Sequence, residues 1–396
     1  MKISKVVQFF CILALMGCAP KSVEQSAATP TSKVIPLSAS PSSIQPSPLA
    51  PTPVETAMPA SSIKIIDKQT LNQLALLHSW DVDGAYSYRS SNFWFSDSNQ
   101  FIIPVSGKYP MDGMQSIRVD NLMPLWFLKS LNSDFTINED NQILINLGGL
   151  QVFDRQGIEI QTIHTNHFCD IDEPISSYIV AISGTNLVVT GQQDSYSNFG
   201  LNGAAYDKAR LLIWDISKNS CSELIKRFDG FLSSLSVSDD GRYISYIVVI
   251  KTTDALKSIV HIYDLNLRKE KCELADGYNY TARFTRQNQL AVYDSREGTI
   301  SIVTVADCAI KMKFSIGTEI VKAFAISPSG EMFAGITDDV LRFWDVQTGE
   351  KLREISSKGN LSLVGFSPDG HFLVTAKGAA LLTEKDEVIL WGIPEN

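Results

Sequence analysis

A unit of alternating apolar and polar positions recurs toward the end of the chain. Its clearest copy runs from Phe366-Ser-Pro-Asp-Gly370 through an apolar stretch to Val388-Ile-Leu-Trp391. The preceding copy reads Ala323-Phe-Ala-Ile-Ser-Pro-Ser-Gly330, then Met332 to Ile336, then Val340 to Asp345. Self-similarity at a period of roughly forty residues is typical of solenoids and propellers built from one repeated unit.

Reading backward from these copies gives a unit of four strands, in which a polar turn follows the first strand. Residues such as Asn, Asp, Ser, Pro and Gly suit this turn because they tolerate left-handed backbone or preset φ. The first turns are Ser96–Asn99, Asn138–Asn141, Ser183–Asn186, Ser238–Gly241, Thr285–Asn288, Ser327–Gly330 and Ser367–Gly370.

The remaining strands of each unit show the alternation of half-buried strands. Third strands are predicted at Ser116–Asp120, Leu150–Asp154, Leu211–Asp215, Val260–Asp264, Thr299–Val303, Val340–Asp345 and Val388–Trp391. Fourth strands are predicted at Leu125–Leu131, Ile158–His164, Glu223–Phe228, Lys269–Leu274, Ala309–Phe314 and Lys351–Ile355. The last unit ends without a fourth strand.

The missing strand is predicted at the other end of the chain. Leu71–Leu77 precedes the first unit and has the pattern of a fourth strand. Pairing with the last unit would close the ring and leave only short, protected sheet edges. The alternative is a helical turn outside the ring. The predicted fold class is therefore all-β, a seven-bladed β-propeller closed by an N-terminal strand.

The third strands carry a family resemblance. Trp214-Asp215 and Trp344-Asp345 end two of them, and Tyr263-Asp264 and Phe153-Asp154 are close variants. In this respect residues 63–396 resemble the WD40-repeat β-propeller family. The chain departs from the family because no Gly-His dipeptide precedes a first strand; Gly370-His371 lies in another turn. The buried Asp-His-Ser-Trp network of that family is therefore not expected to be complete in any blade.

The first residues resemble an export signal. Two lysines precede the apolar run Val6–Leu15, which is too short to span a bilayer, since a spanning helix needs about twenty residues. Leu15-Met16-Gly17-Cys18 resembles the bacterial lipobox, which implies cleavage before Cys18 and lipidation of that cysteine. An ordinary signal peptide with an incidental cysteine is the alternative.

Composition completes the predicted layout. Residues 18–62 are rich in Pro, Ser, Thr and Ala, so they bury too little apolar surface to fold and are expected to form a disordered tether. The predicted organisation is a signal peptide at 1–17, the lipidated cysteine and linker at 18–62, and the propeller at 63–396. A formal net charge of −9 argues against nucleic acid as a partner, because such a surface needs a basic stripe. The predicted location is the outer side of a membrane, held by the lipid anchor.

No motif for catalysis or for a cofactor stands out, so we expect neither an enzyme nor a bound cofactor. The one compact group of metal-type ligands is His164, His167 and Cys169. Structural zinc sites usually take four ligands from two separated pairs, and no second pair is visible. A solvated loop is therefore favoured over a metal site.

Four cysteines fall in the repeat region: Cys169, Cys221, Cys272 and Cys308. The last three stand at or near the start of the fourth strand in successive blades. Fourth strands of neighbouring blades splay apart at the rim, beyond the ~7 Å Cα separation that a disulfide allows. We therefore expect mostly free thiols, with a disulfide as the alternative.

Long insertions carry the clearest functional signal. They lie at 107–114, 192–210 and 251–258, on the same face of the predicted ring as the connection 164–174. Loops that converge on one face of a propeller commonly form its binding surface. The predicted partner-binding residues, of types enriched at interfaces, are Tyr109, Met111, Met114, Tyr196, Phe199 and Tyr206.

The predicted function is a protein-interaction scaffold at the cell envelope, with a protein or another envelope component as partner. One alternative is a propeller enzyme or ligand sensor with a site in the central channel. The first strands that would line this channel are mostly Phe, Ile, Val and Ser, as at Phe93, Phe95, Phe284, Phe324 and Phe366. Two further alternatives are an envelope-assembly scaffold, and loops that serve only as decoration.

Overall fold

The structure is a computed structural model. It describes residues 47–48, 63–82, 93–106, 112–120, 124–129, 135–146, 149–164, 177–182, 184–193, 209–228, 230–251, 256–277, 280–285, 288–317, 320–337, 339–357, 360–378 and 386–395. The chain divides into Met1–Ser42, which holds no described residue, and Ser43–Asn396, which holds the repeat region. The predicted signal sequence, Cys18 and nearly all of the predicted tether lie outside the described residues.

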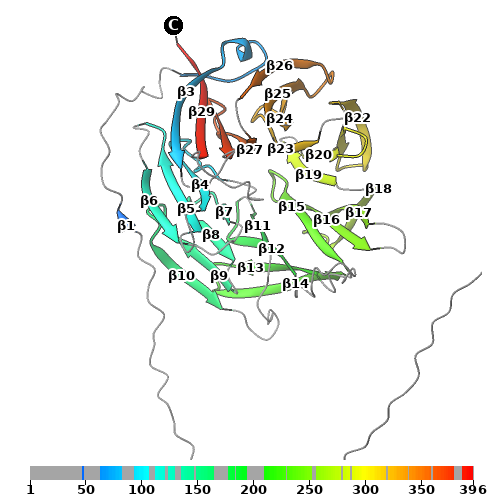
Figure 1. Cartoon of the computed structure of the whole chain (residues 1–396). Helices are drawn as coiled ribbons and strands as arrows, with labels where there is room; N and C mark the ends of the chain where they lie inside the picture. Colours follow the sequence, from blue (N-terminus) through cyan, green and yellow to red (C-terminus); the bar gives the residue numbers. More distant parts are fainter. Residues whose placement is uncertain are drawn as a thin grey trace, which may run out of the picture. The chain divides into compact units, whose positions relative to one another are not determined.

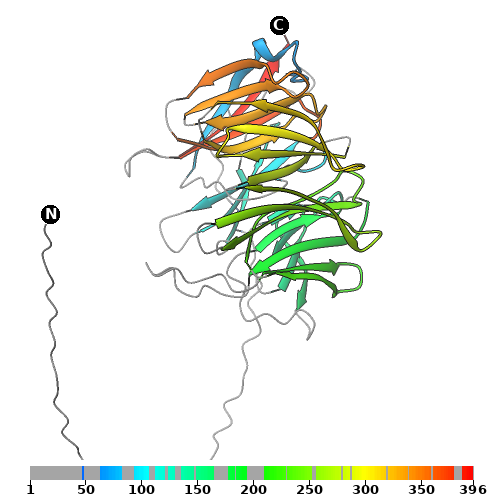
Figure 2. The ribbon, with the colours of Figure 1, turned by 90° about the vertical axis from the view of Figure 1, so that its right-hand side faces the viewer.

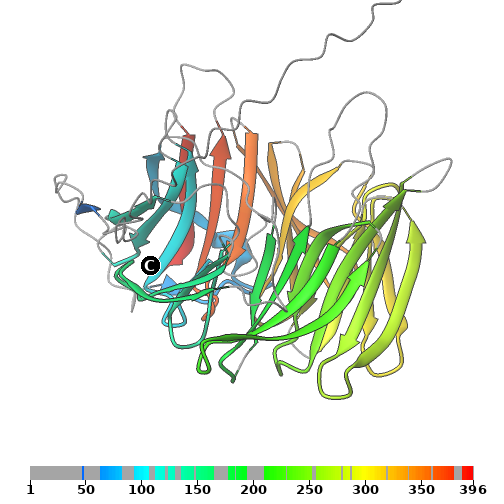
Figure 3. The ribbon, with the colours of Figure 1, turned by 90° about the horizontal axis from the view of Figure 1, so that it is seen from below.

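Seven small antiparallel sheets are arranged around a central channel (Figure 1), so the predicted seven-bladed, all-β propeller is confirmed. In five of the sheets the strands follow one another in chain order with the first strand innermost, and in blades one and seven earlier strands of the chain pair at the outer edge. Figure 3 shows the strands of blades three to five running side by side from one end of the ring to the other. The hydrophobic clusters lie between neighbouring blades, as where Val189 and Leu211 of one blade meet Ile244 and Val248 of the next. Each blade is therefore stabilised by its neighbours.

The blades follow one another around the ring in chain order. Blade one contains β4 (Gln100–Ser106), β5 (Asp112–Arg118) and β6 (Pro124–Lys129); blade two β7 (Phe135–Ile137), β8 (Ile143–Asn146), β9 (Gly149–Phe153) and β10 (Glu159–His164). Blade three contains β11 (Ser177–Ala181), β12 (Leu187–Gln193), β13 (Ala209–Asp215) and β14 (Ser220–Phe228). Blade four contains β15 (Phe231–Val237), β16 (Tyr243–Lys251), β17 (Leu256–Asp264) and β18 (Lys269–Gly277). Blade five contains β19 (Tyr280–Thr285), β20 (Gln289–Asp294), β21 (Thr299–Thr304) and β22 (Ala309–Ser315). Blade six contains β23 (Val321–Ile326), β24 (Met332–Thr337), β25 (Val340–Asp345) and β26 (Lys351–Ser356). Blade seven contains β27 (Asn360–Phe366), β28 (Phe372–Gly378) and β29 (Asp386–Pro394).

Blade one departs from the common pattern at both edges. Its first strand is reduced to an isolated bridge between Trp94 and Phe101. At the outer edge, β1 (Ser47–Pro48) pairs with β6. These two residues of the predicted tether therefore supply a short extra strand to the sheet.

The ring closes by pairing the two ends of the domain, as predicted. Strand β3 (Ala75–Val82) runs antiparallel to β29, from Val82 opposite Asp386 to Ala75 opposite Gly392, and β2 (Ile63–Lys64) pairs farther along the same edge. Figure 2 shows β3 and β29, in blue and red, lying together.

The boundary of the closing strand differs from the prediction of Leu71–Leu77. Residues Leu71–Gln73 form a 3-10 turn, η2, and the strand begins at Ala75. Leu71 and Leu74 are buried in the cluster between blades six and seven, where they pack with residues such as Met332 and Leu373. Their apolar character therefore reflects this contact instead of a strand.

The first turns explain the recurring polar residues. Gly241, Gly330 and Gly370 have φ near +70°, at +66°, +75° and +77°, where glycine avoids steric cost. The serine that opens each of these turns accepts a hydrogen bond from a later backbone N–H, at 2.9 to 3.0 Å: Ser238 from Tyr243, Ser327 from Met332 and Ser367 from Phe372.

The tryptophans of the third strands are tied to the second strands in two blades. The buried indole Nε1 of Trp214 donates to Thr190 Oγ1 at 2.8 Å, and Trp391 Nε1 donates to Thr375 Oγ1 at 2.9 Å. In blade six, Gly335 takes the place of the threonine, because a Cβ there would lie 2.8 Å from the ring of Phe333. Aspartates at the ends of several third strands cap the next turn; Asp264 Oδ1, for example, accepts the backbone N–H groups of Asn266 and Leu267 at 3.0 Å.

Replacing Thr190 with Val is expected to destabilise the protein by about 1–3 kcal/mol, because it leaves the buried Trp214 N–H without an acceptor at nearly constant volume. Urea unfolding measures the loss. Thr375→Val should cost a similar amount, and Trp214→Phe combined with Thr190→Val should cost less than the sum of the two single changes. An unchanged unfolding midpoint in Thr190→Val would show that the hydrogen bond contributes nothing.

The prediction of free thiols is wrong for two of the cysteines. Cys272 and Cys308 form a disulfide with a Cα–Cα distance of 5.9 Å. Cys308 lies in the turn before β22 with φ of +60°, and not on the fourth strand. Its side chain packs in the cluster between blades four and five, which contains Cys272 of β18. The turn therefore reaches the neighbouring blade, although the fourth strands themselves diverge.

Candidate functional site

The central channel holds a cavity of 760 Å³. All seven blades contribute to its wall, through the first strand or, in blade one, the residues that replace it. One contributor from each blade, in chain order, is Trp94, Thr136, Val180, Ser234, Arg283, Phe324 and Val364. A smaller cavity of 300 Å³ shares Asp239, Phe284 and Phe366 with it and lies among the first turns, so it marks one mouth of the channel.

Serine and threonine side chains line one side of the cavity, and several of them join blades four and five. Ser234 Oγ donates to the carbonyl oxygen of Ala282 at 3.2 Å, and Ser236 Oγ accepts from the backbone N–H of Phe284 at 3.3 Å. Ser236 also shares a 2.7 Å hydrogen bond with Ser245. Two hydroxyls on the wall, Ser233 Oγ and Ser362 Oγ, are buried and have no hydrogen-bond partner among the described residues.

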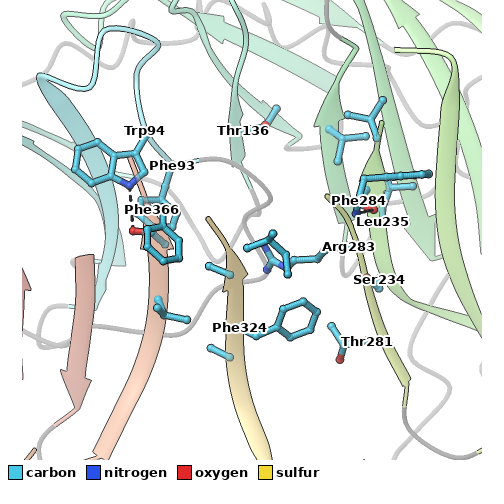
Figure 4. A pocket seen from close by; sticks show the side chains of 18 of the residues that line it. Phe93, Trp94, Thr136, Ser234, Leu235, Thr281, Arg283, Phe284, Phe324 and Phe366 are labelled. Atoms are coloured by element: carbon cyan, nitrogen blue, oxygen red, sulfur yellow. Dashed lines mark hydrogen bonds between the residues drawn. The ribbon is translucent and has the colours of Figure 1, made fainter. Parts of the chain in front are cut away.

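Aromatic side chains line the opposite side. Phe93, Trp94 and Phe366 lie together there in Figure 4, with the Trp94 indole N–H directed at the carbonyl oxygen of Gly365 at 3.4 Å. Gly365 is required at this point, because a Cβ would lie 2.2 Å from the Phe93 ring. Of the phenylalanines predicted for the first strands, Phe95 is fully buried in the core, and the others line the channel.

Arg283 is the cation inside this cavity. It lies on β19, the first strand of blade five, which also contributes Tyr280, Thr281 and Phe284 to the cavity wall. Figure 4 shows its side chain reaching into the middle of the cavity. The guanidinium carbon lies 5.8 Å from the ring centroid of Phe324 on the next blade, within the range of a cation–π contact.

No described residue forms a hydrogen bond or an ion pair with Arg283. Burial lowers the pKa of its guanidinium, and no described carboxylate opposes that effect. Even so, an arginine keeps its charge in proteins. The channel therefore contains a partly buried cation, and among the described residues only an aromatic face lies against it.

The other charged side chains on the wall are exposed. Glu139 accepts the backbone N–H of Gly184 at 2.8 Å, and Lys322 donates to Asn360 Oδ1 at 2.6 Å. Asp239 lies where the channel meets the first turns. These groups lie at the mouths of the channel or connect neighbouring blades, whereas Arg283 lies inside the channel.

A second polar cluster joins blades three and four. Lys226 Nζ of β14 lies 2.7 Å from Glu270 Oε1 of β18, and the Tyr246 hydroxyl donates to the same carboxylate. The His261 ring stacks on Tyr246 with centroids 4.9 Å apart, and its Nδ1 lies 3.7 Å from Glu270 Oε2.

Burial raises the pKa of the Tyr246 hydroxyl, and the hydrogen bond to Glu270 raises it further. For Glu270 burial acts upward, but the side chains of His261, Lys226 and Tyr246 hold its pKa below the ordinary value. The cluster thus has a neutral phenol beside a paired carboxylate. This arrangement suits a link between two blades better than a proton-transfer site.

Most of the predicted site residues lie outside the described part of the chain, namely Cys18, Tyr109, Met111, His167, Cys169, Tyr196, Phe199 and Tyr206. His164 ends β10, and its side chain also lies outside the description. Met114 is 2% exposed in the core of blade one, so it is not available at the surface that the other partner-binding residues were predicted to form.

Sequence reasoning missed Arg283. Its one signal was a charged residue at an alternating position of a first strand, between Ala282 and Phe284. Within the described ranges, no group of three or more His, Cys, Asp or Glu side chains could hold a metal ion. The described residues also include no helix long and apolar enough to cross a membrane. No protein-family model matches the sequence, and no curated protein matches it either.

Proposed function

We propose that this protein is an exported, lipid-anchored interaction scaffold, a WD40-like propeller whose partner docks over one mouth of the central channel. The closed ring with an open channel at its centre carries this proposal. All seven blades line one cavity of 760 Å³, and pairing of the two chain ends locks the ring. Such a ring offers a broad preorganised surface, which lowers the ordering cost of binding.

The WD40 kinship is supported by two kinds of contact. The indole-to-threonine hydrogen bonds of Trp214 and Trp391 link third and second strands at equivalent positions. Aspartates at the ends of third strands cap the following turns, as at Asp215 and Asp345. The proposal of a lipid anchor rests on the lipobox-like Leu15–Cys18.

The docking face is proposed to be the one that carries the insertions. The loop of blade three spans residues 194–208 between β12 and β13, and that of blade four spans 252–255 between β16 and β17. Both leave the same end of their sheets as the start of the first strands. A partner seated there would lie over the channel mouth near Lys322.

Two variants test the proposal on native membranes by crosslinking and pull-down. Cys18→Ala should move the protein from the membrane to the soluble fraction, and unchanged fractionation would refute the anchor. Replacing residues 194–208 with a short Gly-Ser linker should spare folding, since β12 ends at Gln193 and β13 begins at Ala209.

Capture of the partner by the loop variant should fall at least tenfold. The matched control replaces residues 217–219, in the turn between β13 and β14 at the opposite end of the same sheet, with a linker of equal length, and should keep full capture. Full capture by the blade-three variant, with its thermal unfolding unchanged, would show that the docking face is wrongly assigned.

A ligand-binding module with its site in the channel is the second candidate. Arg283, inside the cavity without an ion-pair partner among the described residues, favours it specifically.

A further inference from the structure

We propose that Arg283 binds the carboxylate of an apolar monocarboxylic ligand that enters the central channel. The inference rests on the proposed function, because it takes the channel to be part of the binding surface. It adds the chemistry of the group that the channel receives and the residue that receives it.

Arg283 has no carboxylate partner among the described residues. Arg283 lies in the cavity wall with the Phe324 ring at 5.8 Å, and no described carboxylate pairs with it. Two other arginines of the described structure have carboxylate partners: Arg155 with Asp97, and Arg242 with Asp264. Burying an unpaired charge is costly, and a cation–π contact offsets only part of that cost. A ligand anion would remove the imbalance.

The single positive charge of Arg283 favours a ligand with a single negative charge. One guanidinium presents a planar fork of donors that matches the two oxygens of a carboxylate. A singly charged carboxylate would form a neutral pair with Arg283. A phosphate dianion would leave an uncompensated negative charge in the cavity, which is unfavourable at low dielectric.

The residues of the wall also include two serine hydroxyls without a described partner. Ser233 Oγ and Ser362 Oγ are buried on it and have no hydrogen-bond partner among the described residues. They come from blades four and seven, so they approach the cavity from different sides of the ring. A polar ligand group would satisfy hydroxyls of this kind.

Much of the cavity wall near Arg283 is aromatic. Phe93, Trp94, Phe324 and Phe366 line the same cavity. A volume of 760 Å³ falls in the range of small-molecule sites, about 300–1,000 Å³, which are mostly apolar with a few placed polar groups. The ligand is therefore expected to carry an aromatic or aliphatic body next to its carboxylate.

The test uses the full chain and three probes that each carry a phenyl ring: 3-phenylpropionate, its amide and phenyl phosphate. Binding is followed by titration calorimetry and by ligand-observed NMR. The wild type should bind 3-phenylpropionate at least tenfold more tightly than the amide or phenyl phosphate. Equal binding of acid and amide would overturn the proposal, and tighter binding of phenyl phosphate would overturn the choice of a carboxylate.

Arg283→Met keeps the length and apolar character of the side chain but removes the charge. It should weaken 3-phenylpropionate binding at least tenfold and leave the amide unaffected. The matched control is Lys322→Met, which removes a cation from the mouth of the same channel and should change binding less than threefold. Unaltered acid binding by Arg283→Met would overturn the assignment.

Folding of the variant is checked independently. Arg283→Met should unfold at the same or a higher temperature than wild type, since it removes a partly buried charge that has no carboxylate partner among the described residues. If it does not fold, Arg283→Lys keeps the charge but lacks the planar fork, and it should bind the acid more weakly than wild type. Full affinity in Arg283→Lys would then overturn recognition by a guanidinium fork.

The proposed function and this inference can fail separately. If the blade-three loop replacement abolishes partner capture while Arg283→Met binds the acid normally, the result supports the interaction scaffold and refutes the carboxylate site. If acid binding depends on Arg283 while the loop replacement leaves capture intact, the reverse holds. Competition between 3-phenylpropionate and partner capture would assign the carboxylate to the partner, and its absence would assign it to a free acid.

Discussion

Deleting residues 63–82 is expected to abolish cooperative folding of the propeller. The deletion removes β2, η2 and β3, and so leaves the whole outer edge of β29 unpaired. It also removes five buried apolar side chains, those of Ile63, Ile66, Leu71, Leu74 and Val82.

Each of these side chains contributes about 1.5–3 kcal/mol on burial, so the loss is on the order of 10 kcal/mol. A domain as a whole is stable by only about 5–15 kcal/mol. Circular dichroism during heating should therefore show no sharp transition, and size exclusion should show aggregated or expanded protein.

A peptide of residues 63–82 supplies the matched control. Added to the deleted chain, it should restore a cooperative transition, because it carries every group that β29 and the cluster between blades six and seven have lost. The same peptide with Leu71→Asp and Leu74→Asp should fail to do so. A deleted chain that melts like the parent without any peptide would show that ring closure does not support the fold.

Removing the Cys272–Cys308 disulfide is expected to lower the free energy of unfolding by about 3–4 kcal/mol. The bridge closes a loop with a sequence separation of 36 residues and connects β18 of blade four to the turn that leads into β22 of blade five. Its main effect is to restrict the unfolded chain, with a smaller effect on the packing of the cluster that contains Cys272. Guanidinium unfolding of Cys272→Ala combined with Cys308→Ala measures the loss.

Reductant separates the bridge from the packing of its side chains. Dithiothreitol should destabilise the wild type by nearly the same amount as the double substitution and should leave the double variant unchanged. Identical unfolding midpoints for wild type with and without reductant would show that the bond does not stabilise the protein.

The repeat could be predicted from sequence because local chemistry fixes its turns and strand ends. Val340–Asp345 is strand β25 as predicted, since Asp345 ends the strand and caps the next turn. Boundaries were less accurate where a neighbouring strand sets the length. The predicted third strand Val260–Asp264 extends back to Leu256, because its hairpin with β16 continues as far as Lys251.

The errors have a common physical origin in contacts between blades. Leu71 and Leu74 are apolar because they fill the space between blades six and seven, and the same pattern was interpreted as a strand. Cys308 was predicted to lie too far from Cys272 for a disulfide, although the turn in which it stands brings their Cα atoms within 5.9 Å. The sequence of one segment does not show which residues of a neighbouring blade its side chains contact.

The candidate site was the least predictable part. The position of Arg283 on a first strand could be predicted to lie beside the channel. Whether a carboxylate faces its guanidinium depends on the other six blades, which also line the channel. Only the assembled ring shows that Phe324 is the described group against it. Charge balance in such a cavity is a property of the whole closed structure.

The pairing of Val82 with Asp386 also sets an order in time. The chain emerges N-terminus first, so β2 and β3 are made before the other strands of blade seven and have no partner until β29 is released. Blades two to six can assemble from local hairpins meanwhile, but the last sheet is completed only after β29 has been made. A prematurely terminated chain would therefore leave β3 exposed as an unpaired edge, available to the same segment of another incomplete copy.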